Sequence, residues 1–346
     1  MSNTNVITPK VNTGADILKF IMSVFVVATH TGLLGDFILP FVRLAVPVFF
    51  VLSGYFFFSK VNSIENSHGK KAYLKKSVKH NLQLYAFWFI VLSPLTFYIR
   101  DYFSGGVIKG ILAILHNFLL GSTFQASWYI TALITGLVIL FFLSKKCSNT
   151  LLIIIGAVLY IPALLSSNYL FIPMLSEGTK EIYHVFTTVF LLPCRNVFAA
   201  MIFLVLGKII AEKKDSSDSD GYCMKALIGF GVLFAEILAL DIGKVPIKDT
   251  DCFVTLPFIV YYLCRWVLLL NVKTSCSGVL RKLSTLSYCS HMAVFMIVGK
   301  LLSLLDIPDF ENIIVFALTL LLTWAVGLMI LKLERFRLFG FLKYSH

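Results

Sequence analysis

Charged residues are scarce in this chain of 346 residues. Lys, Arg, Asp and Glu make up 14% of the sequence, whereas a soluble globular domain carries about 25%. Hydrophobic residues reach 58%, and the mean hydropathy is +0.87. This composition leaves no room for a sizeable soluble domain and predicts a membrane protein with many spanning segments.

The seven cysteines lack the spacing of a metal site or a redox pair. No Cys-x-x-Cys motif occurs, and most of the cysteines lie in or beside apolar stretches, where cysteine behaves as a small hydrophobic residue. We therefore expect no metal cofactor. The first residues lack a basic n-region, and no small-residue cleavage site follows the first apolar stretch. We expect that stretch to be a retained helix, not a signal peptide.

Ten apolar stretches approach or reach the length of about 20 residues that a helix needs to cross a bilayer. They are residues 15–34, 38–58, 81–99, 126–144, 150–166, 189–211, 224–241, 252–271, 284–305 and 311–332. A further apolar stretch at 107–121 is short and is predicted to be a re-entrant or interfacial helix. The predicted fold class is therefore all-α, a polytopic membrane bundle of about ten transmembrane helices.

Lysine and arginine are distributed unevenly between the segments that connect these stretches. With the N-terminus inside, segments such as 60–80 and 212–223 hold most of them, and the opposite segments hold few. Because cytoplasmic loops are enriched in Lys and Arg, both termini are predicted to be cytoplasmic. The net charge of +12 then needs no nucleic-acid partner. We expect one transmembrane domain at 15–332, an N-terminal tail at 1–14 and a basic C-terminal tail at 333–346.

Two ionisable residues of the first stretch, Lys19 and His30, point to chemistry. An ionisable side chain inside a span costs about 2.5–3.5 kcal/mol on insertion scales, so such residues usually have a function. Lys19 and His30 are eleven positions apart, which is three turns and about 16 Å along one face of a helix. This face carries a cation near the cytoplasm and an imidazole nearer the outside. Imidazole can accept a proton near neutral pH, as a general base for a hydroxyl must.

Each candidate also has an ordinary structural explanation. Lys19 lies one turn from the interface and could extend its amine there or pair with Asp16. His30 could be a hydrogen-bonded packing residue. Ser53, in FFVLSGYF, could be a nucleophile, although a Ser-Gly pair in a membrane helix more often permits close packing. Arg195, inside the sixth stretch, is harder to explain by packing alone.

Five sequence fragments occur in an order and spacing that are typical of one family. They are Lys19-x10-His30 within DILKFIMSVFVVATH, PVFFVLSGYFFF in the second stretch, SWYITALI in the fourth, RNVFAAMIFLVLGKII in the sixth, and LSTLSYCSH in the ninth, where Ser284, Tyr288 and His291 form a Ser-x3-Tyr-x2-His pattern. Together they resemble the membrane-bound acyltransferase-3 family, and the resemblance covers nearly the whole chain from Asp16 to Lys332.

The resemblance implies an enzyme. Members of this family are thought to take an acyl group, usually acetyl, from cytoplasmic acyl-CoA and pass it to a hydroxyl of a carbohydrate or glycolipid at the outer face. It implies a protein of the bacterial cytoplasmic membrane that needs acyl-CoA as co-substrate. His30 matches the catalytic histidine, acting as base or as transient acyl carrier. Arg195 is expected to hold the acceptor or the oxyanion.

The resemblance also suggests where the donor binds, with one departure. Lys19 stands where the family usually has arginine, and the basic loop 70–79 offers Lys75, Lys76 and Lys79 in place of arginines. Lysine keeps the charge but loses the bidentate fork of arginine. These four lysines are expected to attract or contact the CoA phosphates. The residues expected to line the passage for the substrates are Ser53, Trp128, Ser284, Tyr288 and His291.

Two other functions are compatible with the sequence. A transporter or exporter of an envelope precursor could use the same fold, because buried charges serve transport as well as catalysis. A structural partner in a polysaccharide-assembly complex is the third interpretation. The expected partners are membrane lipid and the acceptor, together with either a second copy of the chain or envelope-assembly proteins; nucleic acid is not expected. The residues do not identify the acceptor or the acyl group.

Overall fold

The computed structural model describes residues 12–35, 37–167, 169, 176–213, 219–247, 250–305 and 312–346, and every regular element in these ranges is helical. The elements are α1 (Thr13–His30), α2 (Leu39–Val42), α3 (Ala45–Asn62), α4 (Ser67–Ile99), α5 (Val107–Leu120), α6 (Trp128–Leu143), α7 (Asn149–Ser166), α8 (Glu177–Phe190), η2 (Pro193–Arg195), α9 (Val197–Glu212), α10 (Ser219–Ile242), α11 (Leu256–Leu269), α12 (Ser277–Leu304), α13 (Asn312–Leu333) and η4 (Arg337–Ser345). Most of the predicted N-terminal tail (1–11) and part of segment 212–223 lie outside the described residues.

Seven spans among the described helices are long and apolar enough to cross a membrane. They are α1, the continuous α2–α3 segment, α4, α7, α10, α12 and α13, and the pair α8–η2 and α9, bent by 41°, is an eighth candidate. The apolar helices α5, α6 and α11 have only 14, 16 and 14 residues, or about 21–24 Å against a hydrocarbon core of about 30 Å. The structure therefore confirms an all-helical, multi-pass protein, whereas the count of ten stays a prediction.

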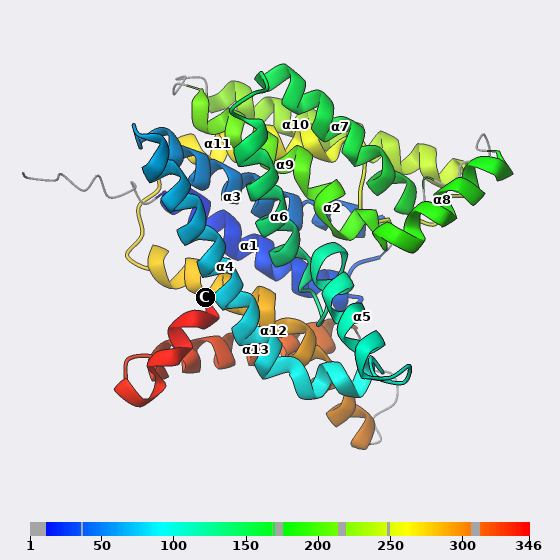
Figure 1. The fold of residues 1–346 in the computed structure, drawn as a ribbon, viewed down its shortest axis with the longest axis vertical. Coiled ribbons are helices and arrows are strands. Elements are labelled where there is room, and N and C mark those ends of the chain that lie inside the picture. The colour runs from blue at the N-terminus through cyan, green and yellow to red at the C-terminus, as the bar shows by residue number, and fades with distance from the viewer. Residues whose placement is uncertain are drawn as a thin grey trace, which may run out of the picture.

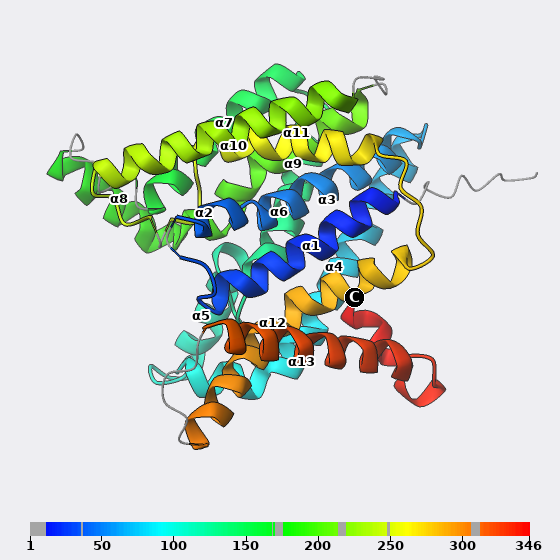
Figure 2. The same ribbon diagram turned by 180° about the vertical axis from the view of Figure 1, so that it is seen from behind.

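Helices α3 and α9 form the centre of the bundle, with α1, α6, α7 and α11 packed around them (Figures 1 and 2). Two glycines let these helices approach closely. A Cβ on Gly207 would lie 2.2 Å from the Val51 carbonyl oxygen, and one on Gly54 would lie 2.8 Å from the Leu204 carbonyl oxygen. Small residues at such contacts allow tight backbone packing in membranes. The close-packing role of the Ser-Gly pair in the second stretch is thus confirmed for Gly54.

Gly207→Ala should lower the melting temperature of the purified protein, because the added methyl group overlaps backbone that cannot move aside. Overpacking of this kind costs about 1–3 kcal/mol. Gly231→Ala is the matched control, because it lies on helix α10 and an added Cβ meets nothing within 4 Å. Equal melting temperatures for the two variants in the same detergent would show that the α3–α9 contact does not limit stability.

Helix α1 ends earlier than the first apolar stretch predicted. The helix stops at His30, and Gly32 has a positive φ of 67° that a glycine adopts easily. His30 is therefore the last helical residue of α1, and the stretch 31–34 is not part of the helix. The histidine stands at the mouth of the bundle instead of inside a continuous span.

The basic segment 70–79 is helical, which corrects the prediction of a loop. Helix α4 begins at Ser67, and the Asn66 side chain caps it by accepting a hydrogen bond from the Gly69 amide. Lysine, alanine and leucine favour helices, so the helix starts in the polar segment and continues into the apolar one.

The sixth predicted span is also broken. Arg195 lies in the short 3-10 turn η2 between α8 and α9, not inside a helix as the sequence suggested. The turn begins at Pro193, which has no backbone N–H to continue the helical hydrogen bonds. The Asn196 side chain then starts α9 by accepting from the Phe198 amide.

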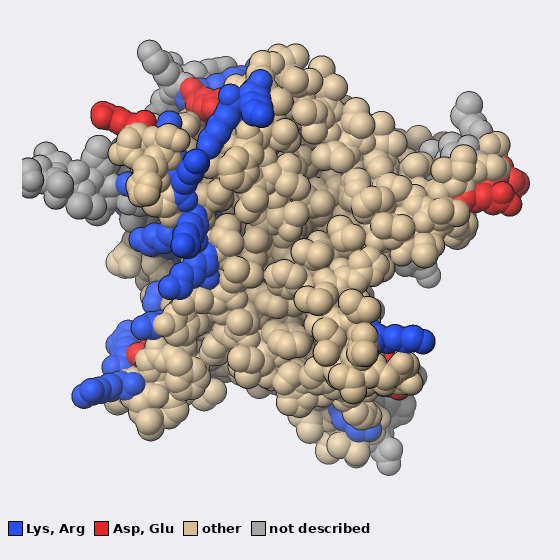
Figure 3. Space-filling view, in the orientation of Figure 1, with Lys and Arg blue, Asp and Glu red and all other residues tan. Residues whose placement is uncertain are grey.

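Basic residues gather at one end of the molecule. Figure 3 shows Lys and Arg as a band along one edge, where the start of α4 and the C-terminus lie in Figure 1. The predicted tail is folded there: η4 packs against α4 and α13, and the Trp88 indole donates to the Ser345 carbonyl oxygen at 2.9 Å. The charge asymmetry that predicted both termini inside is thus visible in three dimensions, and the sidedness itself stays a prediction.

Impermeant maleimide should label a cysteine at Ser104 in intact cells and should label one at Glu65 only after the cells are opened. Both positions are exposed and lie at opposite ends of α4. Each substitution is made in a cysteine-free background, with that background as the control for nonspecific labelling. Labelling at position 65 in intact cells would reverse the orientation.

Candidate active site

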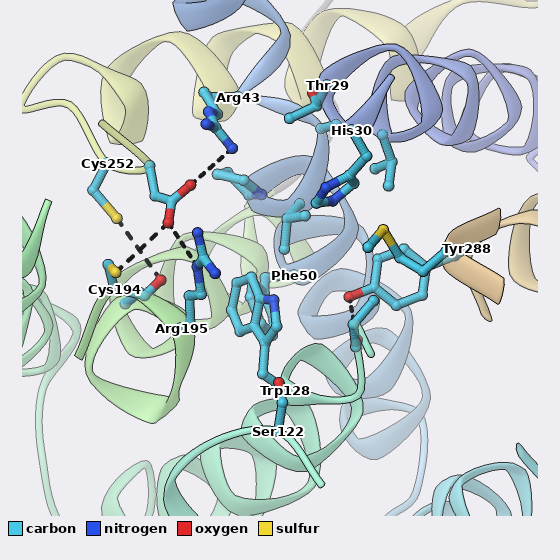
Figure 4. Close-up of a pocket in the computed structure, with 18 of the residues that line it drawn as sticks. Thr29, His30, Arg43, Phe50, Ser122, Trp128, Cys194, Arg195, Cys252 and Tyr288 are labelled. Carbon is cyan, nitrogen blue, oxygen red and sulfur yellow. Dashed lines mark hydrogen bonds and ion pairs between the residues drawn. The ribbon is translucent and has the colours of Figure 1, made fainter. Parts of the chain in front are cut away.

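A cavity of about 160 Å³ opens at the C-terminal end of α1. Its wall combines residues that are far apart in the sequence, including His30, Arg43, Trp128, Arg195 and Asp251. Figure 4 shows Arg43, Arg195 and His30 around this space. We call it the outer cavity, because it lies at the end of the bundle opposite the basic band.

The His30 side chain faces the outer cavity, and the His291 ring lies against it. The two ring centroids are 5.2 Å apart, and His291 is fully buried. His291 Nδ1 lies 2.8 Å from the Tyr288 carbonyl oxygen. Because a carbonyl only accepts, Nδ1 must carry the proton, and in neutral His291 the other nitrogen, Nε2, is an acceptor. Nε2 is buried and has no hydrogen-bond partner among the described residues. The ring next to His30 therefore carries an unused hydrogen-bond acceptor.

Asp251 connects two arginines in the wall of the outer cavity. Its Oδ1 lies 2.8 Å from Nη1 of Arg43, and its Oδ2 accepts from Nε of Arg195 at 2.7 Å. The Ser167 hydroxyl accepts from the Asp251 backbone amide and so holds this loop in place. Burial alone would raise the pKa of the Asp251 carboxyl, but the two guanidinium groups outweigh burial and hold this pKa below its ordinary value.

A second cavity, of about 150 Å³, lies nearer the basic end of the bundle. Its wall includes Lys19, Ser53 and Ser284, together with His80 of α4 and the C-terminal His346. We call it the inner cavity. The cation and the imidazole that share a face of α1 therefore open into different cavities.

Asp16 does not form the ion pair with Lys19 that was one interpretation of the sequence. Asp16 is buried; it accepts a hydrogen bond from the Ser277 hydroxyl, and its Oδ1 lies 3.6 Å from Nε of Arg281. Both partners belong to α12, so Asp16 joins α1 to α12. The Lys19 amine lies 5.0 Å from the centre of the Phe56 ring, within the range of a cation–π contact.

Aromatic side chains pack together where the two cavities share a residue. Tyr288 lines both of them. Its hydroxyl donates to the Ala126 carbonyl oxygen at 2.8 Å, and its ring centroid lies 5.2 Å from that of Tyr129 and 5.9 Å from that of Phe49. The Tyr129 hydroxyl in turn lies 3.0 Å from the Ser53 hydroxyl. We call these three rings the aromatic wall.

The structure brings most of the predicted site residues to these cavities. His30, Arg195 and Trp128 line the outer cavity, Lys19, Ser53 and Ser284 line the inner one, and Tyr288 lines both. His291 lies behind His30 instead of lining either cavity. Lys75, Lys76 and Lys79 are exposed on α4 outside the inner cavity, next along the helix to His80, which lines it.

Three charged residues of the outer cavity were missed by sequence reasoning: Arg43, Arg100 and Asp251. In the sequence they read as ordinary charges of external segments, which need no further explanation. The signal that could have found them is their position, because Arg100 and Asp251 directly flank an apolar stretch and Arg43 lies near the start of one. Their convergence depends on how distant helices pack.

Comparisons with known proteins give a family match and partial relatives. The model of an acyltransferase domain, acyltransferase family 3, matches residues 12–332. The chain is 26% identical to an amino-acid racemase of Enterococcus faecalis over 292 residues. The aligned region covers 82% of this chain and 39% of that protein. It is 26% identical over 269 residues to a serine/alanine racemase of Enterococcus gallinarum, covering 74% and 37%. The chain thus spans about two fifths of the length of these two relatives. No solved structure shows significant similarity.

Proposed function

Because the chain belongs to the acyltransferase-3 family, we propose that it moves an acyl group, in the first instance acetyl, from cytoplasmic acyl-CoA to a hydroxyl of a cell-envelope carbohydrate or glycolipid. We place it in the bacterial cytoplasmic membrane. One observation carries the proposal: His30 and Lys19 lie on the same helix but open into two cavities that share Tyr288. Two cavities of this kind suit a donor that enters from one side and an acceptor that enters from the other.

The inner cavity is the proposed donor site. Lys19 would contact a phosphate group of CoA, and the exposed Lys75, Lys76 and Lys79 would raise the local concentration of this polyanion by long-range attraction. The acyl end of the donor must reach His30, about 16 Å further along α1. The aromatic wall therefore has to let the thin acyl-bearing arm pass.

The proposed reaction is a direct acyl transfer. His30 takes the proton from the acceptor hydroxyl as its oxygen attacks the carbonyl carbon of the thioester. The carbon–sulfur bond then breaks, and the proton passes from His30 to the leaving CoA thiolate, so that the products are an ester and CoA. Arg195 uses only Nε on Asp251, and one of its two terminal nitrogens is the proposed donor to the developing oxyanion.

His291 is proposed to support His30 from behind. Its Nε2 can accept a hydrogen bond, directly or through a water molecule, from the N–H of His30. Such a bond would leave the other nitrogen of His30 facing the acceptor as the base. Ser53, Trp128, Ser284 and Tyr288 are proposed to shape the passage.

The racemase activity named for the relatives is not proposed for this chain, because most of each relative lies outside the matched region. Transport is the second candidate, and one observation favours it: two cavities displaced toward opposite ends of the bundle are also what a carrier needs. Purified protein in liposomes, given labelled acetyl-CoA and candidate acceptors, separates the two functions. A transferase releases CoA and forms an acylated product, whereas a carrier accumulates unchanged substrate and releases no CoA.

Lys19→Ala should raise the KM for acyl-CoA about 10- to 100-fold, because a hydrogen bond to a charged group is lost. Lys19→Arg should keep the affinity, and the exposed Lys146→Ala is the control for a general loss of positive charge. Asp16→Ala should instead lower the melting temperature, because it breaks the link between α1 and α12. An unchanged KM in well-folded Lys19→Ala would exclude the binding role.

A further inference from the structure

The outer cavity carries more positive than negative charge. Among the described residues that line it, Arg43, Arg100 and Arg195 contribute three positive charges and Asp251 contributes one negative charge, so the net charge, His30 aside, is +2. Charges withdrawn from bulk water are costly unless an opposite charge or hydrogen-bond acceptors compensate for them. A ligand of this cavity can supply that compensation.

The terminal N–H groups of Arg195 remain available as hydrogen-bond donors. Asp251 takes only its Nε, and the Arg195 side chain remains 48% exposed. No other described residue accepts a hydrogen bond from its terminal nitrogens. In Figure 4 the Arg195 side chain extends toward Arg43, with Trp128 beside it, and all three residues line the cavity. A planar guanidinium with free terminal N–H groups is suited to a carboxylate or phosphate.

Arg100 reaches the same cavity from the end of α4, where neutral groups hold it. Its Nη1 donates to the Tyr102 hydroxyl at 3.0 Å and to the Ser122 carbonyl oxygen. It pairs with no carboxylate of the described chain. These contacts fix the direction of the side chain but leave its charge uncompensated, which is the arrangement expected of a preformed anion site.

We propose that the outer cavity binds an anionic group, a phosphate or a carboxylate, between Arg100 and Arg195. On the function proposed above, this group belongs to the acceptor, and it positions the acceptor so that its hydroxyl faces His30. The acceptor is then an acidic or phosphorylated carbohydrate, or a lipid-linked one with an anionic head group, and a neutral sugar of the same shape binds more weakly.

Binding can be measured without any acyl transfer. Inorganic phosphate should raise the melting temperature of the detergent-purified protein above the value in potassium chloride of equal ionic strength, because a ligand of the folded state stabilises it. Arg100→Gln and Arg195→Gln should each weaken the apparent affinity for phosphate about tenfold. Lys109→Gln, an exposed cation on the nearby α5, is the control and should behave as wild type.

Two further comparisons make the outcome decisive. Arg100→Lys keeps the charge and should retain most of the phosphate shift even if Arg100→Gln folds poorly. An equal shift in the wild type, the arginine variants and Lys109→Gln would show an unspecific salt effect and overturn the anion site. Absence of any shift in the wild type would do the same.

The source of the anion is assigned by two arms. Nanodiscs of phosphatidylcholine are compared with nanodiscs that also contain phosphatidylglycerol, and glucose is compared with glucose 6-phosphate in solution. Stabilisation by phosphatidylglycerol that depends on Arg100 and Arg195 assigns the site to a lipid head group. Stabilisation by glucose 6-phosphate but not glucose assigns it to a soluble acceptor, and a lack of stabilisation in both arms contradicts the proposal.

Failure of this inference can be told apart from failure of the proposed function. Phosphate binding that is lost in the arginine variants, without any acyl transfer by the wild type, would leave the anion site intact and remove the transferase. Acyl transfer to neutral acceptors, with the same KM in Arg100→Gln as in the wild type, would leave the transferase intact and remove the anion site.

Discussion

His30→Gln should reduce the rate of acyl transfer by about 10²–10⁴-fold, the usual contribution of a general base. Glutamine keeps a similar size and can still form hydrogen bonds, but it cannot take a proton from the acceptor hydroxyl. Because the His30 side chain faces the outer cavity, the melting temperature should stay close to that of the wild type. Transfer of labelled acetyl from acetyl-CoA and thermal unfolding are measured on the same preparation.

Two controls give this result its meaning. His184→Gln makes the same change at an exposed position on α8 and should leave both quantities unchanged. His30→Ala should lose activity to the same extent as His30→Gln. Activity near the wild-type level in His30→Gln, together with a loss of stability in His30→Ala, would make His30 a packing residue and remove it from the mechanism.

Asp251→Ala should destabilise the protein by about 3 kcal/mol and lower its activity as well. Removing one partner of a buried ion pair costs about 3–5 kcal/mol, and the lower end applies because Arg195 is half exposed. Without the carboxylate, Arg43 and Arg195 repel each other and no longer keep their positions in the outer cavity. Asp241→Ala, at an exposed position near the end of α10, is the control and should have little effect.

The same carboxyl group predicts a pH dependence. Since the folded state lowers the pKa of Asp251, its stabilising contribution is fully present above the ordinary carboxyl pKa. This contribution is lost as the pH falls through the lowered folded value. The wild type should therefore lose more stability than Asp251→Asn over this acidic range. Parallel melting curves of the two proteins on acidification would contradict a stabilising role for the ion pair.

The sequence by itself determined the membrane character, the helical fold and the family. Long apolar stretches leave no alternative to helices, because backbone groups in lipid must be paired within the segment. The spacing of Lys19 and His30 also determined that they share one face of a helix, since helical geometry is local. For the same reason the close-packing glycine beside Ser53 could be foreseen from its neighbours alone.

Only the tertiary structure decided what surrounds these residues. The two cavities arise where separate helices meet. The same is true of the aromatic wall, whose Tyr288 lines both cavities, and of the contact between the His291 and His30 rings. The cluster of Arg43, Asp251 and Arg195 likewise joins the α2–α3 segment, the loop before α11 and the turn before α9. Hydropathy and periodicity describe each helix along its own axis, whereas these contacts depend on how helices distant in sequence are placed relative to one another.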